Sequence, residues 1–204
     1  MKAAVFGAAL VGLLSAGVAQ ADDGQWLVRG RVVSMQNDNG NSPTLSLGKV
    51  ELADKVFPEV DISYFFTKNI AAELILTYPQ KHDVKLNGGK IGSIKQLPPT
   101  LLAQYHFLPD GQFDPYVGAG INYTRVWGAE FDPAVDSVYH LGVEQKSIGP
   151  AVQVGMDYKI DKNWSVNVDV KYIDIKVDVK SAGSKLTELK VSPIIAAVGV
   201  GYRF

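Results

Sequence analysis

The sequence predicts an all-β fold, namely an eight-stranded antiparallel transmembrane β-barrel with short periplasmic turns and long extracellular loops. Three observations predict this fold. Apolar and polar residues alternate with period two in eight segments, the connections between these segments alternate between short and long, and aromatic residues stand at the segment ends. In a soluble β-sandwich nothing requires connections to alternate in length, so the pattern favours a membrane barrel.

The first 21 residues have the features of a cleavable secretory signal peptide. Lys2 provides a positive start, residues 3–18 are mainly apolar, and residues 19–21 form an Ala-Gln-Ala cleavage site. A retained membrane helix would need about 20 apolar residues, but glycines interrupt this run and two aspartates follow it. We therefore expect cleavage after Ala21 and a single domain, the outer-membrane β-barrel, over residues 22–204.

The composition of the 204-residue chain excludes several classes of protein. Cys is absent, which excludes disulfides and thiolate metal sites. The 20 Lys and Arg and 21 Asp and Glu residues are scattered, whereas binding to nucleic-acid phosphates needs a basic stripe. The region after the signal peptide lacks an apolar run of helix-spanning length. We therefore expect no cofactor, no nucleic-acid partner and no membrane helix.

The first four predicted strands lie between residues 26 and 107, and in each we assign the apolar set to lipid. Their predicted lumen-facing residues include charged groups such as Arg29, Asp61 and Glu73. The lipid-facing sets are Trp26, Val28, Gly30 and Val32, then Val60, Ile62, Tyr64 and Phe66, then Ala72, Leu74, Leu76 and Tyr78, then Leu101, Ala103, Tyr105 and Phe107.

The last four predicted strands lie between residues 117 and 204, and the seventh has the clearest alternation. The lipid-facing sets are Val117, Ala119, Ile121 and Tyr123, then Val152, Val154, Met156 and Tyr158, then Trp164, Val166, Val168, Val170 and Tyr172, then Ile194, Ala196, Val198, Val200, Tyr202 and Phe204. Eight is an even number, as single-chain bacterial barrels require. A barrel of this size has an interior filled by side chains or one small ligand, which excludes a wide aqueous porin.

The connections alternate in length along the chain. The predicted periplasmic turns are Thr67–Asn69, Leu108–Asp114 and Ile160–Asn163. The predicted extracellular loops are Met35–Lys55, Pro79–Ile94, Arg125–Lys146 and Asp174–Glu188. This alternation orients the barrel, because bacterial barrels have their short turns on the periplasmic side.

Aromatic residues form two predicted girdles at the membrane–water interfaces, where Trp and Tyr are favoured. One girdle, beside the short turns, contains Phe66, Phe107, Tyr158 and Trp164, and the other contains Tyr78, Tyr123 and Tyr172. The chain ends at Phe204 behind alternating apolar residues. This end resembles the terminal signal that the barrel-assembly machinery recognises, so that machinery is an expected partner together with outer-membrane lipids.

Charged residues of the predicted lumen face have two interpretations, a selective ion path or an internal network of ion pairs. We favour the network, because isolated charges in a confined interior are costly. The residues concerned are Arg29, Arg31, Glu59, Asp61, Glu73, Asp157, Asp169, Lys171 and Arg203.

An enzymatic role has little support in the sequence. A nucleophilic hydrolase or acyltransferase needs a nucleophile with a base within hydrogen-bond reach. His82 and His140 lie in predicted loops and His106 lies near a periplasmic turn, and no Ser has an evident His and carboxylate partner. Gly118 and Gly120 lack the helix and lysine that follow a phosphate-binding loop. We expect a protein that is not an enzyme.

Several segments of the sequence resemble the OmpW family. They are Leu97-Pro98-Pro99-Thr100-Leu101, the run from Pro115 to Thr124, Gln153-Val154-Gly155-Met156-Asp157-Tyr158, Tyr172-Ile173-Asp174-Ile175 and Gly201-Tyr202-Arg203-Phe204. The resemblance covers nearly the whole chain after the signal peptide, except the long loops. It implies an eight-stranded barrel with a narrow, largely apolar interior that admits small hydrophobic molecules and releases them sideways into the outer membrane.

Within this resemblance, Ile75 and Lys171 are the candidates for the lumen constriction. Lys171 stands where the family pattern leads us to expect an aromatic residue, which puts a strictly apolar gate in doubt. Pro98 and Pro99 fall inside the predicted fourth strand, and together with Pro79 they are the candidates for a lateral seam, because proline removes a donor from the strand ladder. The alternative is that the fourth strand begins after Pro99, above the membrane.

Three functions are compatible with this sequence. The first is an outer-membrane channel for passive uptake of small, mainly hydrophobic solutes. The second is a non-transporting structural or adhesin-like barrel that acts through its extracellular loops, and the third is a lipid-modifying enzyme. Flux into liposomes separates the first from the second, and activity on outer-membrane lipid would reveal the third.

Overall fold

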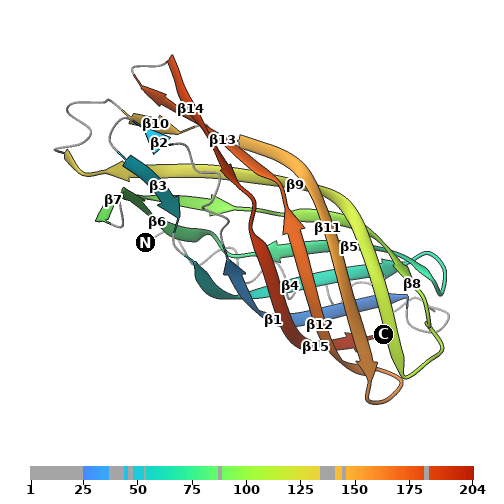
Figure 1. Cartoon of the computed structure of the whole chain (residues 1–204). Coiled ribbons are helices and arrows are strands. Elements are labelled where there is room, and N and C mark those ends of the chain that lie inside the picture. The colour runs from blue at the N-terminus through green and yellow to red at the C-terminus, as the bar shows by residue number, and fades with distance from the viewer. Residues whose placement is uncertain are drawn as a thin grey trace, which may run out of the picture.

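The computed structural model describes residues 25–36, 44–45, 48–52, 54–86, 89–133, 141–143, 146–181 and 184–204. Within these residues it contains fifteen strands, of which eight close into a barrel (Figure 1). The barrel strands are β1 (Trp26–Gln36), β4 (Lys55–Phe65), β5 (Ile70–Thr77), β8 (Thr100–His106), β9 (Phe113–Phe131), β11 (Lys146–Lys159), β12 (Trp164–Ile173) and β15 (Ile194–Arg203). The other strands are β2 (Thr44–Leu45), β3 (Gly48–Leu52), β6 (Gln80–Leu86), β7 (Gly89–Leu97), β10 (Leu141–Val143), β13 (Ile175–Ser181) and β14 (Ser184–Val191).

The eight barrel strands form a closed antiparallel ring in chain order. The ring closes where β15 pairs with β1, for example Val198 with Val32, and where β9 pairs with β11. Closure satisfies backbone groups that would each cost several kcal/mol if left unpaired in hydrocarbon. The predicted eight-stranded antiparallel barrel is confirmed. The predicted signal peptide, residues 1–21, lies outside the described residues.

The two faces of the barrel strands have the predicted orientation. On β12 the exposed and buried residues alternate without exception, so that Val168 is 43% exposed and Asn167 is 0% exposed. None of the side chains that we assigned to lipid is buried, whereas Arg29, Asp61 and Glu73 are fully buried in the interior. The apolar exterior and polar interior invert the arrangement of a soluble protein.

The predicted short turns are confirmed. Four residues, 66–69, separate β4 from β5, and four residues, 160–163, separate β11 from β12. The second turn, between β8 and β9, is shorter than predicted, because β9 already begins at Phe113. In the third turn Asp161 Oδ1 accepts hydrogen bonds from the backbone N–H groups of Asn163 and Trp164, each at 2.8 Å. This carboxylate fixes the reversal of the chain.

The predicted long loops need a correction, because they contain further strands. The segment Pro79–Ile94 forms most of the hairpin β6–β7, and Asp174–Glu188 contributes to the hairpin β13–β14. Strands β2 and β3 lie in the first predicted loop, and β9 extends to Phe131. These strands gather at the end of the barrel opposite the short turns (Figure 1). They extend the sheet beyond the apolar belt.

Candidate functional site: the barrel interior and its proline break

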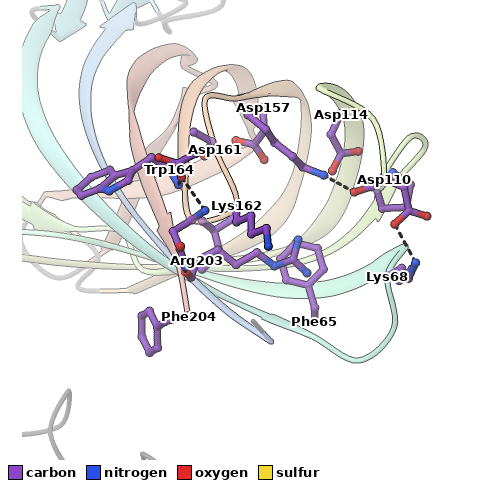
Figure 2. A pocket seen from close by; sticks show the side chains of 15 residues that line it. Phe65, Lys68, Asp110, Asp114, Asp157, Asp161, Lys162, Trp164, Arg203 and Phe204 are labelled. Carbon is purple, nitrogen blue, oxygen red and sulfur yellow. Dashed lines mark hydrogen bonds and ion pairs between the residues drawn. The ribbon is translucent and has the colours of Figure 1, made fainter. Parts of the chain in front are cut away.

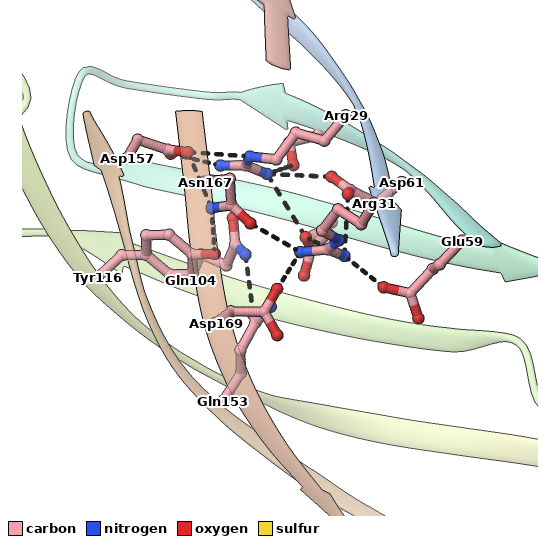
Figure 3. A network of polar contacts seen from close by, with 12 residues as sticks. Arg29, Arg31, Glu59, Asp61, Gln104, Tyr116, Gln153, Asp157, Asn167 and Asp169 are labelled. Carbon is pink, nitrogen blue, oxygen red and sulfur yellow. Dashed lines mark hydrogen bonds and ion pairs between the residues drawn. The ribbon is translucent and has the colours of Figure 1, made fainter. Parts of the chain in front are cut away.

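A network of ion pairs fills the barrel interior, and Arg29 of β1 is one of its two centres (Figure 3). Its guanidinium binds Asp157 of β11 through two nitrogens, with Nη2–Oδ2 at 2.6 Å and Nε–Oδ1 at 3.2 Å. Nη1 lies 3.0 Å from Asp61 Oδ1 and 3.5 Å from Glu73 Oε1. Arg29 therefore joins β1 to β4, β5 and β11.

Arg31, two residues further along β1, is the second centre. Its Nη2 lies 2.9 Å from both Glu59 Oε1 and Asp61 Oδ2, and 3.3 Å from Glu73 Oε1. Its Nη1 donates to Asp169 of β12. Asp61 and Glu73 thus contact both guanidiniums, which makes the two arginines one network.

Lys171 completes this network on its extracellular side. Its Nζ lies 2.6 Å from Glu59 Oε1 and 3.4 Å from Asp169 Oδ1, and the residue is 2% exposed. The predicted pairing of lumen charges is confirmed for these residues. The guanidinium of Arg203 lies over the Phe65 ring, 4.0 Å from the centroid, near the periplasmic end.

Neutral polar groups fill the rest of the same cross-section. Asn167 Nδ2 donates to the Tyr116 hydroxyl at 3.0 Å, and Gln104 Nε2 donates to Gln153 Oε1 at 2.9 Å. Glycine makes room for them, because a Cβ at Gly155 would lie 2.4 Å from the Tyr116 ring and hydroxyl. We call this assembly the polar plug; its members are Arg29, Arg31, Glu59, Asp61, Glu73, Gln104, Tyr116, Gln153, Asp157, Asn167, Asp169 and Lys171.

An apolar layer lies above the polar plug, toward the extracellular end. On β1 the interior sequence passes from Arg31 to Val33 and Met35, and on β5 it passes from Glu73 to Ile75. The layer contains Val33, Met35, Phe57, Ile75, Val84, Ile94, Leu102, Val126, Ala151, Ile173, Ile175, Ile195 and Ala197, all of which are buried. The interior therefore has two storeys, the charged polar plug and a mainly apolar layer that also contains uncharged buried polar residues such as Gln80, Gln96 and Asn122.

The two constriction candidates lie in different storeys. Ile75 belongs to the apolar layer and Lys171 belongs to the polar plug. Both side chains point into the interior and are buried. Their role as the narrowest point stays a prediction.

The three seam candidates come together at one break in the barrel wall. Pro79 lies between β5 and β6, and Pro98 and Pro99 lie between β7 and β8, which run side by side with them. The ladder between these strands has the pair Ile75↔Thr100 and next the pair Gln80↔Gln96, with no pair between them. We call this gap the proline break.

The placement of Pro98 and Pro99 inside the fourth strand is wrong, because β8 begins at Thr100 as the alternative stated. The prolines nevertheless lie in the wall, since β7 and β8 both pair with β9 on either side of them. Asn122 Nδ2 donates to the carbonyls of Pro98 and Pro99 at 3.2 and 3.3 Å, and Tyr123 N donates to Pro99 O at 3.0 Å. The prolines are held by β9, so the break faces β5 and β6.

A cavity of about 730 Å³ lies beneath the polar plug at the end with the short turns (Figure 2). Phe65, Trp164, Arg203 and the plug residue Asp157 contribute to its lining. Charged groups from the turns stand at its rim, where Lys68 Nζ donates to Asp110 Oδ1 at 2.8 Å. This hydrogen bond lowers the pKa of Asp110, and the backbone N–H groups of Trp164 and Asn163 lower the pKa of Asp161.

The histidines have structural partners. His106 Nδ1 lies 3.0 Å from Asp114 Oδ2, and His82 Nε2 lies 3.0 Å from Gln96 Nε2. His140 lies outside the described residues. In the described part of the chain, no group of three His, Cys, Asp or Glu side chains is placed to hold a metal ion, and no helix is long and apolar enough to cross a membrane.

Tyr116 and Leu102 are among the interior residues that the sequence did not identify. Tyr116 was omitted because the predicted fifth strand began at Val117, and Leu102 was omitted from the polar face of the fourth strand because it is apolar. The period-two alternation would have identified both, because Tyr116 lies two positions from Gly118 and Leu102 lies two positions from Gln104, so each pair shares the lumen face. The glycines that admit the arginines were also missed: a Cβ at Gly199 would lie 2.7 Å from Arg31 Cγ.

Comparisons with known proteins agree with this architecture. The model of the OmpW family matches residues 22–204. The uncharacterized outer-membrane protein y4mB of Sinorhizobium fredii is 39% identical over 97% of this chain and 90% of its own length. The dibenzothiophene metabolism operon protein PahQ of Pseudomonas aeruginosa is 26% identical over 58% of this chain and 56% of its own length. The crystal structure of OprG from Pseudomonas aeruginosa superposes with a TM-score of 0.74 at 26% identity, covering 89% of this chain and 96% of that chain.

Proposed function

Because this chain belongs to the OmpW family of outer-membrane β-barrel proteins, we propose that it is a channel for the passive uptake of small, mainly hydrophobic molecules. Solutes enter from outside, dissolve in the apolar layer and leave sideways into the membrane at the proline break. The process needs neither a cofactor nor coupling to energy, and the protein is not an enzyme.

The observation that carries this proposal is the order of the two storeys. A solute that enters from the extracellular end meets the apolar layer first and the polar plug below it. Apolar surface gains about 25 cal/mol per Å² on leaving water, so hydrophobic solutes partition into the layer. To continue through the plug, the solute would have to separate buried ion pairs such as Arg29–Asp157, and an uncompensated buried charge costs about 3–5 kcal/mol.

The proline break offers a less costly exit. On its inner side, Ile75 and Leu102 of the apolar layer lie beside the buried, uncharged polar residues Gln80, Gln96 and Thr100. Its outer side faces lipid, where Tyr78 is 50% exposed and Leu101 is 49% exposed. Since no ladder pair joins the strands at this point, a solute passes without breaking backbone hydrogen bonds between them.

The name of one relative supports the polarity of the solute. PahQ is named after an operon for dibenzothiophene metabolism, and dibenzothiophene is an apolar aromatic molecule. We extend to this chain only the class of solute, small and mainly hydrophobic.

Flux into liposomes tests the channel. Purified mature protein is reconstituted, and the entry of solutes graded in polarity is compared with entry into protein-free liposomes. We expect faster entry of the apolar members of the series. If no member enters faster, the channel is refuted and the non-transporting barrel is favoured instead.

Variants at the break test the exit. Pro98→Ala combined with Pro99→Ala restores two backbone donors, so that the ladder can close and uptake falls. Pro115→Ala, within β9 near the periplasmic end, is the matched control and keeps wild-type uptake. Unchanged uptake in a folded Pro98/Pro99 variant rules out the lateral exit. Ile75→Trp should reduce entry of the largest solutes if this level is the constriction.

A further inference from the structure

A row of four cationic side chains crosses the outer surface of the barrel beside the proline break. They are Lys81 on β6, Lys95 on β7, Arg125 on β9 and Lys146 on β11, and all four are exposed. We call them the cation row. Their interior neighbours, such as His82, Val126 and Ser147, are buried, which places the row on the outward face.

The row lies directly beyond the apolar belt, at the end opposite the short turns. On the membrane side of each cation, two or three positions away along the chain, lies an apolar or aromatic residue. These residues are Tyr78, Leu97, Tyr123 and Ile148, of which Tyr78, Tyr123 and Ile148 are 50%, 39% and 73% exposed. Aromatic belts mark the level of lipid headgroups, so the row lies at the headgroups of the outer leaflet.

The strand register places like charges directly opposite one another. Lys81 pairs with Lys95 in the ladder of β6 and β7, and Arg125 pairs with Lys146 in the ladder of β9 and β11. Lys95 is also diagonal to Arg125, because the next outward residue, Leu97, is the one opposite Arg125. Like charges directly opposite in a sheet are destabilising. The row therefore stores repulsion that an external anion would relieve.

Among the described residues, anionic side chains neutralise only part of the cation row. Glu130 Oε2 lies 3.7 Å from Lys81 Nζ, and both groups are more than half exposed. Lys95, Arg125 and Lys146 form no ion pair with any side chain in the part of the chain that the structure describes. Next to the row, Lys85 and Lys90 form a further pair of facing cations, and Asp83 lies 2.8 Å from Lys90.

The row occupies one side of the barrel only. At the corresponding level of β1 and β4 the exposed residues are Gln36 and Asp54, and Lys55 at the start of β4 reaches toward the row, donating to the carbonyl of Lys81 at 3.0 Å. Beyond β12, Asp174 lies 3.5 Å from Lys176. A general preference for lysine at membrane interfaces would place cations on every strand. The asymmetry points to a ligand that binds one sector of the barrel.

We propose that the cation row binds the phosphate groups of a phosphorylated lipid in the outer leaflet. The acyl chains of that lipid lie along the apolar belt below the row, over Leu97, Tyr123 and Ile148, while its phosphates neutralise the facing cations. This surface borders the proline break, so the bound lipid forms part of the boundary beside it. The proposal does not depend on the transport function.

Titration calorimetry of the detergent-folded mature protein tests this proposal. The probes are lipid A with two phosphates in mixed micelles, the same lipid A after removal of its phosphates, and inorganic phosphate. We expect binding of phosphorylated lipid A that weakens with added salt. Each cation beside an anionic lipid surface contributes about fivefold in affinity. Lys95→Gln with Arg125→Gln should therefore weaken binding by about 25-fold.

A matched control removes two cations elsewhere, Lys162→Gln in a periplasmic turn and Lys176→Gln on β13, and should keep wild-type affinity. Equal binding of dephosphorylated lipid A, equal binding of inorganic phosphate, or an equal loss in the control each overturns the proposal. Thermal unfolding without lipid A separates binding from a structural role. The Lys95/Arg125 variant should be at least as stable as wild type because repulsion is removed, and a clear loss of stability would overturn the proposal.

Discussion

Replacing Arg29 with Met tests whether the polar plug holds the barrel together as a network. Arg29 is 0% exposed and contacts Asp157, Asp61 and Glu73. After the replacement, Asp61 and Glu73 keep contacts with Arg31, but Asp157 loses its guanidinium partner. The loss therefore corresponds to one broken buried ion pair, not three.

We expect Arg29→Met to destabilise the barrel by about 3–5 kcal/mol, the cost of leaving one buried charge without its partner. Asp157 keeps the hydrogen bond from Asn167 Nδ2 at 2.9 Å, which favours the lower half of this range. The double variant Arg29→Met with Asp157→Leu removes both charges of the pair and should recover most of the loss, because replacement of a whole buried pair by apolar side chains is often neutral.

Urea unfolding of the mature barrel in phosphatidylcholine vesicles, followed by Trp fluorescence, measures these free energies. Lys176→Met is the matched control, because Lys176 is 54% exposed in its pair with Asp174, and pairs with a solvent-exposed partner contribute about 0–1 kcal/mol. A cost below about 1 kcal/mol for Arg29→Met would refute the reasoning. So would a double variant as unstable as the single one.

Three further predictions concern packing, a turn and assembly. Gly155→Ala should cost about 1–3 kcal/mol in urea unfolding because its Cβ would overlap the Tyr116 ring, whereas Gly30→Ala, with nothing within 4 Å, should be neutral. The pKa of Asp161 is lowered in the folded state. Its contribution to stability is therefore present above its ordinary pKa of about 3.9 and disappears as the pH falls through the lower folded value. Asp161→Ala should flatten this pH dependence of the free energy of unfolding, measured from pH 6 down to about pH 2. Deletion of Phe204, the proposed contact of the barrel-assembly machinery, should lower the amount of folded barrel in cells but leave refolding into detergent unchanged; equal amounts in cells would contradict this contact.

The membrane-spanning part of the fold could be predicted because lipid and lumen impose opposite demands on alternate residues. On β12, Val166 and Val168 face lipid while Asn167 and Asp169 face the polar plug. The period-two alternation of apolar and polar residues can therefore be read directly from the sequence. The closing pair of β1 and β15 then follows from the cost of an open edge in hydrocarbon.

The extracellular hairpins could not be predicted in the same way. In β6, Gln-Lys-His-Asp-Val-Lys-Leu, polar residues occupy both faces because neither face meets lipid, so no period of two appears in the hydropathy. Proline also misled the prediction. The prediction places Pro98 and Pro99 inside the fourth strand, but β8 begins after them at Thr100, and β7 continues the wall above them and pairs with β9.

The ion-pair partners within the interior likewise could not be predicted from the sequence. Parity identifies Arg29 and Asp157 as interior residues, but they are 128 positions apart, and their contact depends on the tilt and stagger of the closed barrel. The distinction between the two storeys has the same origin. Ile75 and Lys171 both have interior parity, and only their heights within the barrel separate the apolar layer from the plug.

The relative costs of the two exits decide the direction of the proposed transport. A straight path requires the plug to part, and because Asp61 and Glu73 each contact both Arg29 and Arg31, no single pair can separate alone. Two broken pairs at about 3–5 kcal/mol each would slow passage by four orders of magnitude or more, since about 1.4 kcal/mol corresponds to tenfold. At the proline break the strands have no ladder pairs to lose, and the polar contacts there, such as those from Asn122 to the carbonyls of Pro98 and Pro99, are neutral hydrogen bonds, which contribute less than buried ion pairs. A hydrophobic solute that reaches Ile75 therefore leaves sideways through the proline break faster than it passes down through the polar plug.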